Sequence, residues 1–138
     1  MTTKKQEKEI EKIEEGFKRE VKNILFNLAF CIFVLGTVII FYKNILLTFI
    51  LVLFGSILAL IKWKSYRTLI IFFIGGLWGP VSEMLAIKAG VWTYTTTSLF
   101  GVPLWLFLVW GDAAAFIYET AKEIKRIGIK DDNKKTKH

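Results

Sequence analysis

Two acidic residues within long apolar stretches are the side chains best placed to do chemistry. Glu83 and Asp112 have no Lys, Arg or His beside them in those stretches. A charged group deep in a bilayer costs between about 2.5 and 10 kcal/mol or more, so each acid is expected to carry a proton, hold a cation or face a wet interior. A neutral acid can donate a proton, and a carboxylate can load a proton or cation for transport. Both residues are therefore candidate catalytic groups, with structural hydrogen bonding between helices as the alternative.

Small residues share the helix face of Glu83. Gly79 and Gly76 precede it by four and seven residues, and Pro80 removes a backbone hydrogen bond just before it. Such a face lets a flat ligand or a second helix approach the backbone closely. We therefore consider Gly76 and Gly79 as substrate-binding candidates, and plain helix packing explains the same glycines.

Tryptophans provide the apolar part of a candidate pocket. Trp105 shares a helix face with Asp112, and Trp78 lies in the same stretch as Glu83. A slot lined by Trp78, Trp105 and Trp110 would accept an elongated hydrocarbon, and indole faces can stabilise a developing carbocation. Ordinary aromatic packing is the alternative.

The segment from Gly79 to Trp105 resembles integral-membrane carotenoid enzymes, namely the heterodimer-type lycopene cyclases and the bisanhydrobacterioruberin hydratase group. In those families an intramembrane Glu precedes a Gly, Trp and Tyr stretch and a Gly-x-Pro entry into the next helix. The matching residues here are Pro80, Glu83, Gly90, Trp92, Tyr94, Gly101 and Pro103. The cyclase pattern continues with an acidic pair, where this chain has residues 104–106, Leu-Trp-Leu.

The resemblance implies acid chemistry on a polyene. A protonated Glu83 would give its proton to a terminal double bond, and water or a second double bond would capture the cation. Trp92 and Tyr94 would then help to shape the substrate pocket. Such chemistry requires neither a metal nor another cofactor, and the only histidine, His138, and the single cysteine, Cys31, offer no metal-binding pattern.

Composition places the middle of the chain in lipid. The 138 residues are 54% hydrophobic, and their mean hydropathy is +0.46. The chain has a net charge of +7, and most of its charged residues lie in the two ends, which argues against a nucleic-acid partner and for membrane lipid.

Four stretches are long enough to cross a hydrocarbon core of about 30 Å, which takes roughly 20 residues. They predict an all-α, polytopic membrane protein with transmembrane helices at 24–42, 45–61, 68–87 and 99–118. Residues 88–98 are expected to form an external loop or a shallow re-entrant segment. Counting along the helices separates Glu83 and Asp112 by roughly 13 Å in depth, so we do not expect them to share a proton. Ser56 is expected at the level of Asp112.

The flanking charges predict the orientation. Of 19 lysines and arginines, only Lys43 and Lys88 lie at one side of the predicted spans. The positive-inside rule therefore places both termini in the cytoplasm of a multi-pass cell-membrane protein. Residues 1–23 are expected to form a charged amphipathic helix that continues into the first span, and residues 119–138 a basic cytoplasmic tail.

These residues leave three functions open. The first is an enzyme acting on an isoprenoid, a carotenoid or another lipid, with Glu83 as the proton donor. The second is a small proton- or cation-coupled transporter loaded at Glu83 and Asp112. The third is a non-enzymatic assembly or scaffold subunit whose acids are structural. All three agree with a homo-oligomer, because so short a chain encloses little space and its glycine faces favour pairing.

Overall fold

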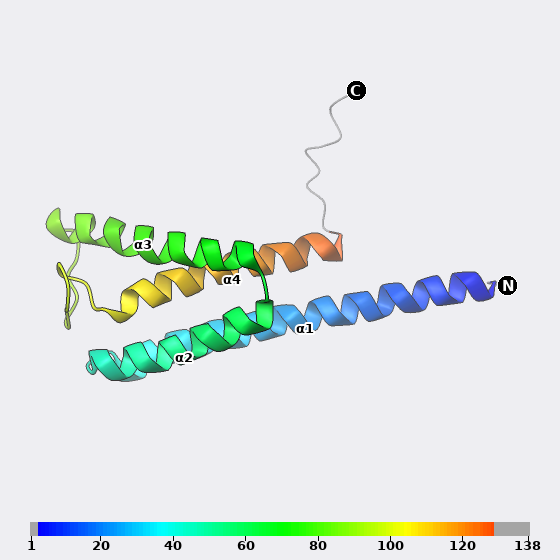
Figure 1. Ribbon diagram of the computed structural model, residues 1–138, viewed down its shortest axis with the longest axis horizontal. Coiled ribbons are helices and arrows are strands. Elements are labelled where there is room, and N and C mark those ends of the chain that lie inside the picture. Colours follow the sequence, from blue (N-terminus) through cyan, green and yellow to red (C-terminus); the bar gives the residue numbers. More distant parts are fainter. Residues whose placement is uncertain (1–2, 129–138) are drawn as a thin grey trace, which may run out of the picture.

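The computed structural model describes residues 3–128 as an all-α protein. Its helices are α1 (Lys4–Phe41), α2 (Ile45–Trp63), α3 (Tyr66–Lys88) and α4 (Trp105–Ile127). Figure 1 shows α1 beside α2 and α3 beside α4, with the N-terminal half of α1 projecting beyond the bundle. Contacts of α4 with the other three helices hold the two pairs together.

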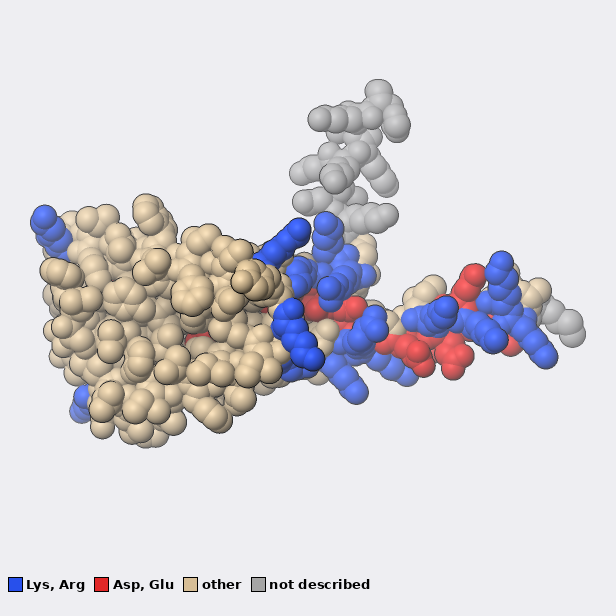
Figure 2. Space-filling model, viewed as in Figure 1, with Lys and Arg blue, Asp and Glu red and all other residues tan. Residues whose placement is uncertain are grey.

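Three helices, α1, α2 and α3, are long and apolar enough to cross a membrane. Their outward faces carry large apolar side chains: Ile32, Ile39 and Leu46 are each about two-thirds exposed. In Figure 2 this uncharged surface covers the bundle. Charged side chains gather at one end of the bundle and along the projecting N-terminal half of α1, which we call the α1 extension. The prediction of a multi-pass membrane protein is confirmed to this extent.

The two shortest connections follow capping rules. Asn44 begins α2 by accepting the backbone N–H of Leu47 at 3.1 Å, and Ser65 begins α3 by accepting that of Thr68 at 3.2 Å. The predicted amphipathic segment indeed continues into the first apolar stretch, because α1 is one helix of 38 residues.

The fourth helix begins later and ends later than expected. Residues 99–104 lie in the loop, because Leu99 and Val102 exchange two hydrogen bonds of 3.0 Å around a turn. Phe100 and Gly101 adopt positive φ values of 47° and 86° in that turn, which no helix permits. Pro103, which lacks an N–H, then precedes the helix that starts at Trp105.

At its other end, α4 continues to Ile127, so residues 119–127 of the expected tail are helical. Glu119 and Glu123 are each only 4% exposed there. The rest of the expected tail, residues 129–138, lies outside the described residues.

Glycines bring α3 and α4 into close contact. A Cβ atom added at Gly76 would lie 2.9 Å from the Phe107 carbonyl oxygen, and one at Gly79 would lie 2.2 Å from the Trp110 ring. The space above both glycines is therefore filled by α4. Helix packing therefore accounts for Gly76 and Gly79. The prediction that these glycines let a flat ligand approach the backbone is wrong, because α4 occupies that space.

Candidate functional site

Glu83 lies near the end of α3 and is surrounded by hydrogen-bond donors. Its Oε2 accepts the Tyr94 hydroxyl and the Trp92 Nε1–H at 3.3 Å. Its Oε1 accepts the Trp110 Nε1–H at 2.9 Å. The structure thus brings together the acid and the two loop aromatics selected from the sequence, and α4 adds Trp110.

The loop after α3 positions two of these donors. Gly90, with a φ of 81°, ends the helix and turns the chain back towards Glu83. Farther along, the Thr96 hydroxyl donates to the Tyr42 carbonyl at 3.0 Å and fixes the loop to the end of α1. The third donor comes from α4, whose Trp110 ring packs over Gly79. Three separate segments therefore converge on one carboxylate.

The donor set determines what Glu83 can do. No lysine or arginine among the described residues forms an ion pair with it. Its partners are one hydroxyl and two indole N–H groups, and an indole N–H can only donate. A carboxylate accepts all three, whereas a protonated Glu83 must turn its own O–H towards the Tyr94 oxygen or a ligand. The site can therefore give up and recover one proton with its partners in place.

The site is partly open on the outside of the bundle. Trp92 is 47% exposed and Trp110 is 37% exposed. Both indoles can therefore be reached from outside the bundle.

Tyr94 is the titratable member of the three donors, and the site perturbs its pKa. Burial raises the pKa of its phenol, and the hydrogen bond and negative charge of Glu83 raise it further. Its ring packs edge-on against Trp105, with centroids 6.3 Å apart. Trp105 is buried and braces Tyr94, so it does not line an open slot.

Glu83→Gln is expected to lower the pKa of Tyr94 without restoring it to that of free tyrosine. The variant removes the negative charge but leaves the burial, which is the larger cause. The measurement is an alkaline titration of phenolate absorbance, in which subtracting the Tyr94→Phe curve isolates Tyr94. An unchanged Tyr94 titration in the Glu83→Gln background would mean that the two side chains are not coupled.

Trp78 does not belong to this site. Its side chain is 74% exposed, whereas Trp105 is 5% exposed. The predicted slot between these two indoles is therefore wrong: α3 directs Trp78 outwards, while α4 directs Trp105 into the bundle.

Asp112 forms a second polar site, on α4. It is 3% exposed, and its Oδ2 lies 2.8 Å from the Ser56 hydroxyl of α2, as the matched depth predicted. The Ser56 hydroxyl also lies 2.8 Å from the Val52 carbonyl. Its single hydrogen can serve only one of these acceptors, so both contacts are satisfied when Asp112 carries a proton. The other oxygen, Oδ1, is buried and has no hydrogen-bonding partner in the part of the chain that the structure describes.

The two acids do not combine into one centre. Glu83 and Asp112 share no hydrogen-bonding partner among the described residues. Within the same residues, no group of three His, Cys, Asp or Glu side chains is arranged to hold a metal ion.

A polar cluster at the charged end of the bundle was missed from the sequence. It includes Glu119 and Glu123 of α4 and Asn27 of α1, all buried. Glu119 and Glu123 follow Asp112 by 7 and 11 residues, which puts all three on one helix face. This helical spacing could have predicted the cluster. It was missed because residues from 119 onwards were expected to form a tail and not a continuation of the fourth helix.

Comparison with known proteins does not assign this chain to a family. No protein-family model, no curated protein and no solved structure matches the chain. Glu83 and Asp112, with the contacts described above, are the chemically distinctive groups within the apolar part of the bundle.

Proposed function

We propose that this protein is a membrane enzyme that carries out acid–base chemistry on an unsaturated isoprenoid-type lipid, with Glu83 as the proton donor. The observation that carries the proposal is the convergence of Trp92, Tyr94 and Trp110 on this one carboxylate. The resemblance to membrane carotenoid enzymes includes Glu83, Trp92 and Tyr94. The exposed indoles support a substrate that arrives from lipid.

The proposed step moves one proton and one electron pair. The Glu83 O–H bond breaks, and the π electrons of a terminal carbon–carbon double bond form a new C–H bond. The neighbouring carbon becomes a tertiary cation, and the three donors stabilise the carboxylate that is left. Either water adds to the cation, or an internal double bond closes a ring. Loss of one proton to Glu83 then completes the product and restores the acid.

The proposed topology has four spans, with both termini in the cytoplasm of the cell membrane. Support comes from α4, which packs along α3 and also contacts α1 and α2, and which buries Asp112, the one acid within the predicted fourth span. The concentration of lysines and arginines at one end of the bundle supports the orientation. Glu83 then lies near the outer surface.

Wild type is expected to produce a new lipid species in cells that make carotenoid precursors, and Glu83→Gln is expected to abolish it. Mass spectrometry of lipid extracts would show a species altered by the mass of water, or an isomer with a shifted retention time. The matched control is Glu15→Gln, the same change at an exposed position of α1. Identical extracts from wild type and Glu83→Gln, with both proteins folded in the membrane, would rule out this reaction.

A second candidate, proton- or cation-coupled transport, is favoured by Asp112. Its buried Oδ1 has no partner and can accept a proton or a cation. In proteoliposomes with an internal pH dye, transport predicts a flux that Asp112→Asn abolishes and Glu15→Gln retains. If neither the lipid species nor the flux is observed, a scaffold role remains.

A further inference from the structure

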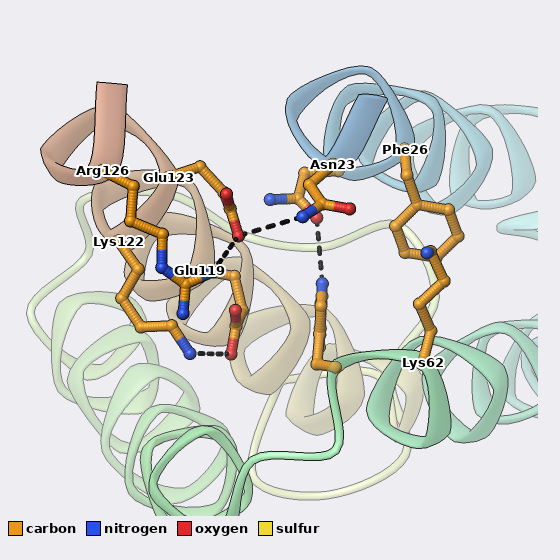
Figure 3. Close-up of a pocket in the computed structure, with 9 residues that line it drawn as sticks. Asn23, Phe26, Lys62, Glu119, Lys122, Glu123 and Arg126 are labelled. Atoms are coloured by element: carbon orange, nitrogen blue, oxygen red, sulfur yellow. Dashed lines mark hydrogen bonds and ion pairs between the residues drawn. The ribbon is translucent and has the colours of Figure 1, made fainter. Parts of the chain in front are cut away.

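A polar cavity lies at the charged end of the bundle, where α1, α2 and α4 meet. Its volume is about 130 Å³. Figure 3 shows Asn23 and Phe26 of α1, Lys62 of α2, and four charged side chains of α4 around it. The cavity is at the opposite end of α3 and α4 from Glu83 and shares no residue with the proposed catalytic site.

Hydrogen bonds hold the walls of the cavity in place. Trp63 donates its Nε1–H to Asn27 at 2.9 Å, and Asn27 donates to the Thr120 hydroxyl at 3.2 Å. The Trp63 ring also packs edge-on against Phe30, with centroids 5.4 Å apart. These contacts join α1, α2 and α4, so the cavity keeps its shape without a ligand.

Most charges around the cavity already have partners. Glu119 pairs with Lys122 at 3.0 Å and also accepts the Thr68 hydroxyl. Glu123 pairs with Arg126 through Oε1, also at 3.0 Å. Each of these ion pairs is neutral by itself, and both acids are only 4% exposed.

Among the described residues, one lysine at the cavity forms no ion pair and one carboxylate oxygen at the cavity accepts no hydrogen bond. Lys62 forms no ion pair with any described carboxylate; its Nζ lies over the Phe26 ring, 5.0 Å from the centroid. The Oε2 atom of Glu123 is buried without a donor, although Oε1 takes both Arg126 and Asn23. A ligand that satisfies both must carry an anionic group for Lys62 and a hydrogen-bond donor, preferably cationic, for Glu123.

We propose that this cavity binds a phosphoethanolamine group, with the ammonium at Glu123 and the phosphate at Lys62. The group is zwitterionic, which matches one unpaired cation and one unpaired carboxylate oxygen. Lys62 lies in the last turn of α2, where the apolar surface gives way to the charged end of the bundle. Lipid headgroups occupy this level of a bilayer, so phosphatidylethanolamine is one source of the group and free phosphoethanolamine is the other.

The test is native mass spectrometry of the full chain released from micelles that contain equal amounts of phosphatidylethanolamine and phosphatidylcholine. The choline headgroup has the same phosphate but no N–H to donate. Wild type is expected to retain phosphatidylethanolamine about tenfold better, the ratio that corresponds to one charge-assisted hydrogen bond. Free phosphoethanolamine, added as a competitor, separates the two sources. Displacement of the lipid shows that the headgroup suffices, and retention of the lipid shows that the acyl chains contribute.

Two variants assign the contacts. Glu123→Gln is expected to abolish the preference between the two lipids, and Lys62→Gln to weaken binding of both about tenfold. Lys62 is exposed and forms no ion pair with residues 3–128, so its loss is expected to leave the fold intact. Lys43→Gln, at the opposite end of α2, is the matched control and should behave as wild type. The proposal would be overturned if wild type retained the two lipids equally, if Lys62→Gln retained them as well as wild type does, and if free phosphoethanolamine did not bind.

Discussion

Gly76→Ala is expected to destabilise the protein by about 2 kcal/mol and to loosen α4 from α3. The added methyl group would lie 2.9 Å from the Phe107 carbonyl oxygen, which belongs to the backbone of α4. A flexible side chain could rotate away, but a helix backbone must shift as a unit, so overpacking of this kind costs about 1–3 kcal/mol. Unfolding of the purified protein in mixed micelles with increasing SDS measures the loss.

The matched control is Gly36→Ala, in the apolar part of α1. A Cβ atom at Gly36 meets nothing within 4 Å, and alanine favours a helix over glycine by up to about 1 kcal/mol. Gly36→Ala should therefore leave stability unchanged or raise it. Equal effects of the two substitutions would show that α3 and α4 are not in close contact at Gly76.

The fold was predictable where one physical property dominates. Long apolar runs separated by short polar gaps predicted the helices, because a chain in lipid must satisfy its backbone groups internally. The start of α4 was not predictable in this way. Residues 99–104 are as apolar as a helix, and the turn at Phe100 and Gly101 depends on backbone angles that hydropathy does not report.

The sequence predicted several residues of the candidate site, but it predicted little of how their side chains are arranged. Glu83, Trp92 and Tyr94 are close in sequence, so a helix end followed by a returning loop was enough to bring them together. Trp110 comes from another helix, and its contact depends on how closely Gly79 lets α4 approach. Helix packing also decides that Trp105 is buried and Trp78 is exposed, and a single sequence carries little information on that rotation.

Ion pairing explains how the buried acids at the charged end of the bundle are accommodated. Arg126 lies 3.0 Å from Glu123 of its own helix and 3.9 Å from Glu20 of α1. The side chains of these two acids are 5% and 9% exposed, so water cannot replace the cation fully. Arg126 therefore connects α1 to α4 at the charged end of the bundle. Apolar side chains hold the helices together in the rest of the bundle, but not at this end.

Arg126→Gln is expected to destabilise the packing of α1 on α4 by about 2 kcal/mol. Removing one partner of a buried pair costs about 3–5 kcal/mol, and the exposure of Arg126 itself, 55%, reduces that figure. Lys125→Gln, the same loss of charge at the exposed neighbouring position, should have little effect. Hydrogen exchange around Glu20 measures the difference, because local opening there exposes the backbone amides of α1. Equal protection in both variants would mean that the ion pairs of Arg126 do not hold the N-terminal part of α1 against α4.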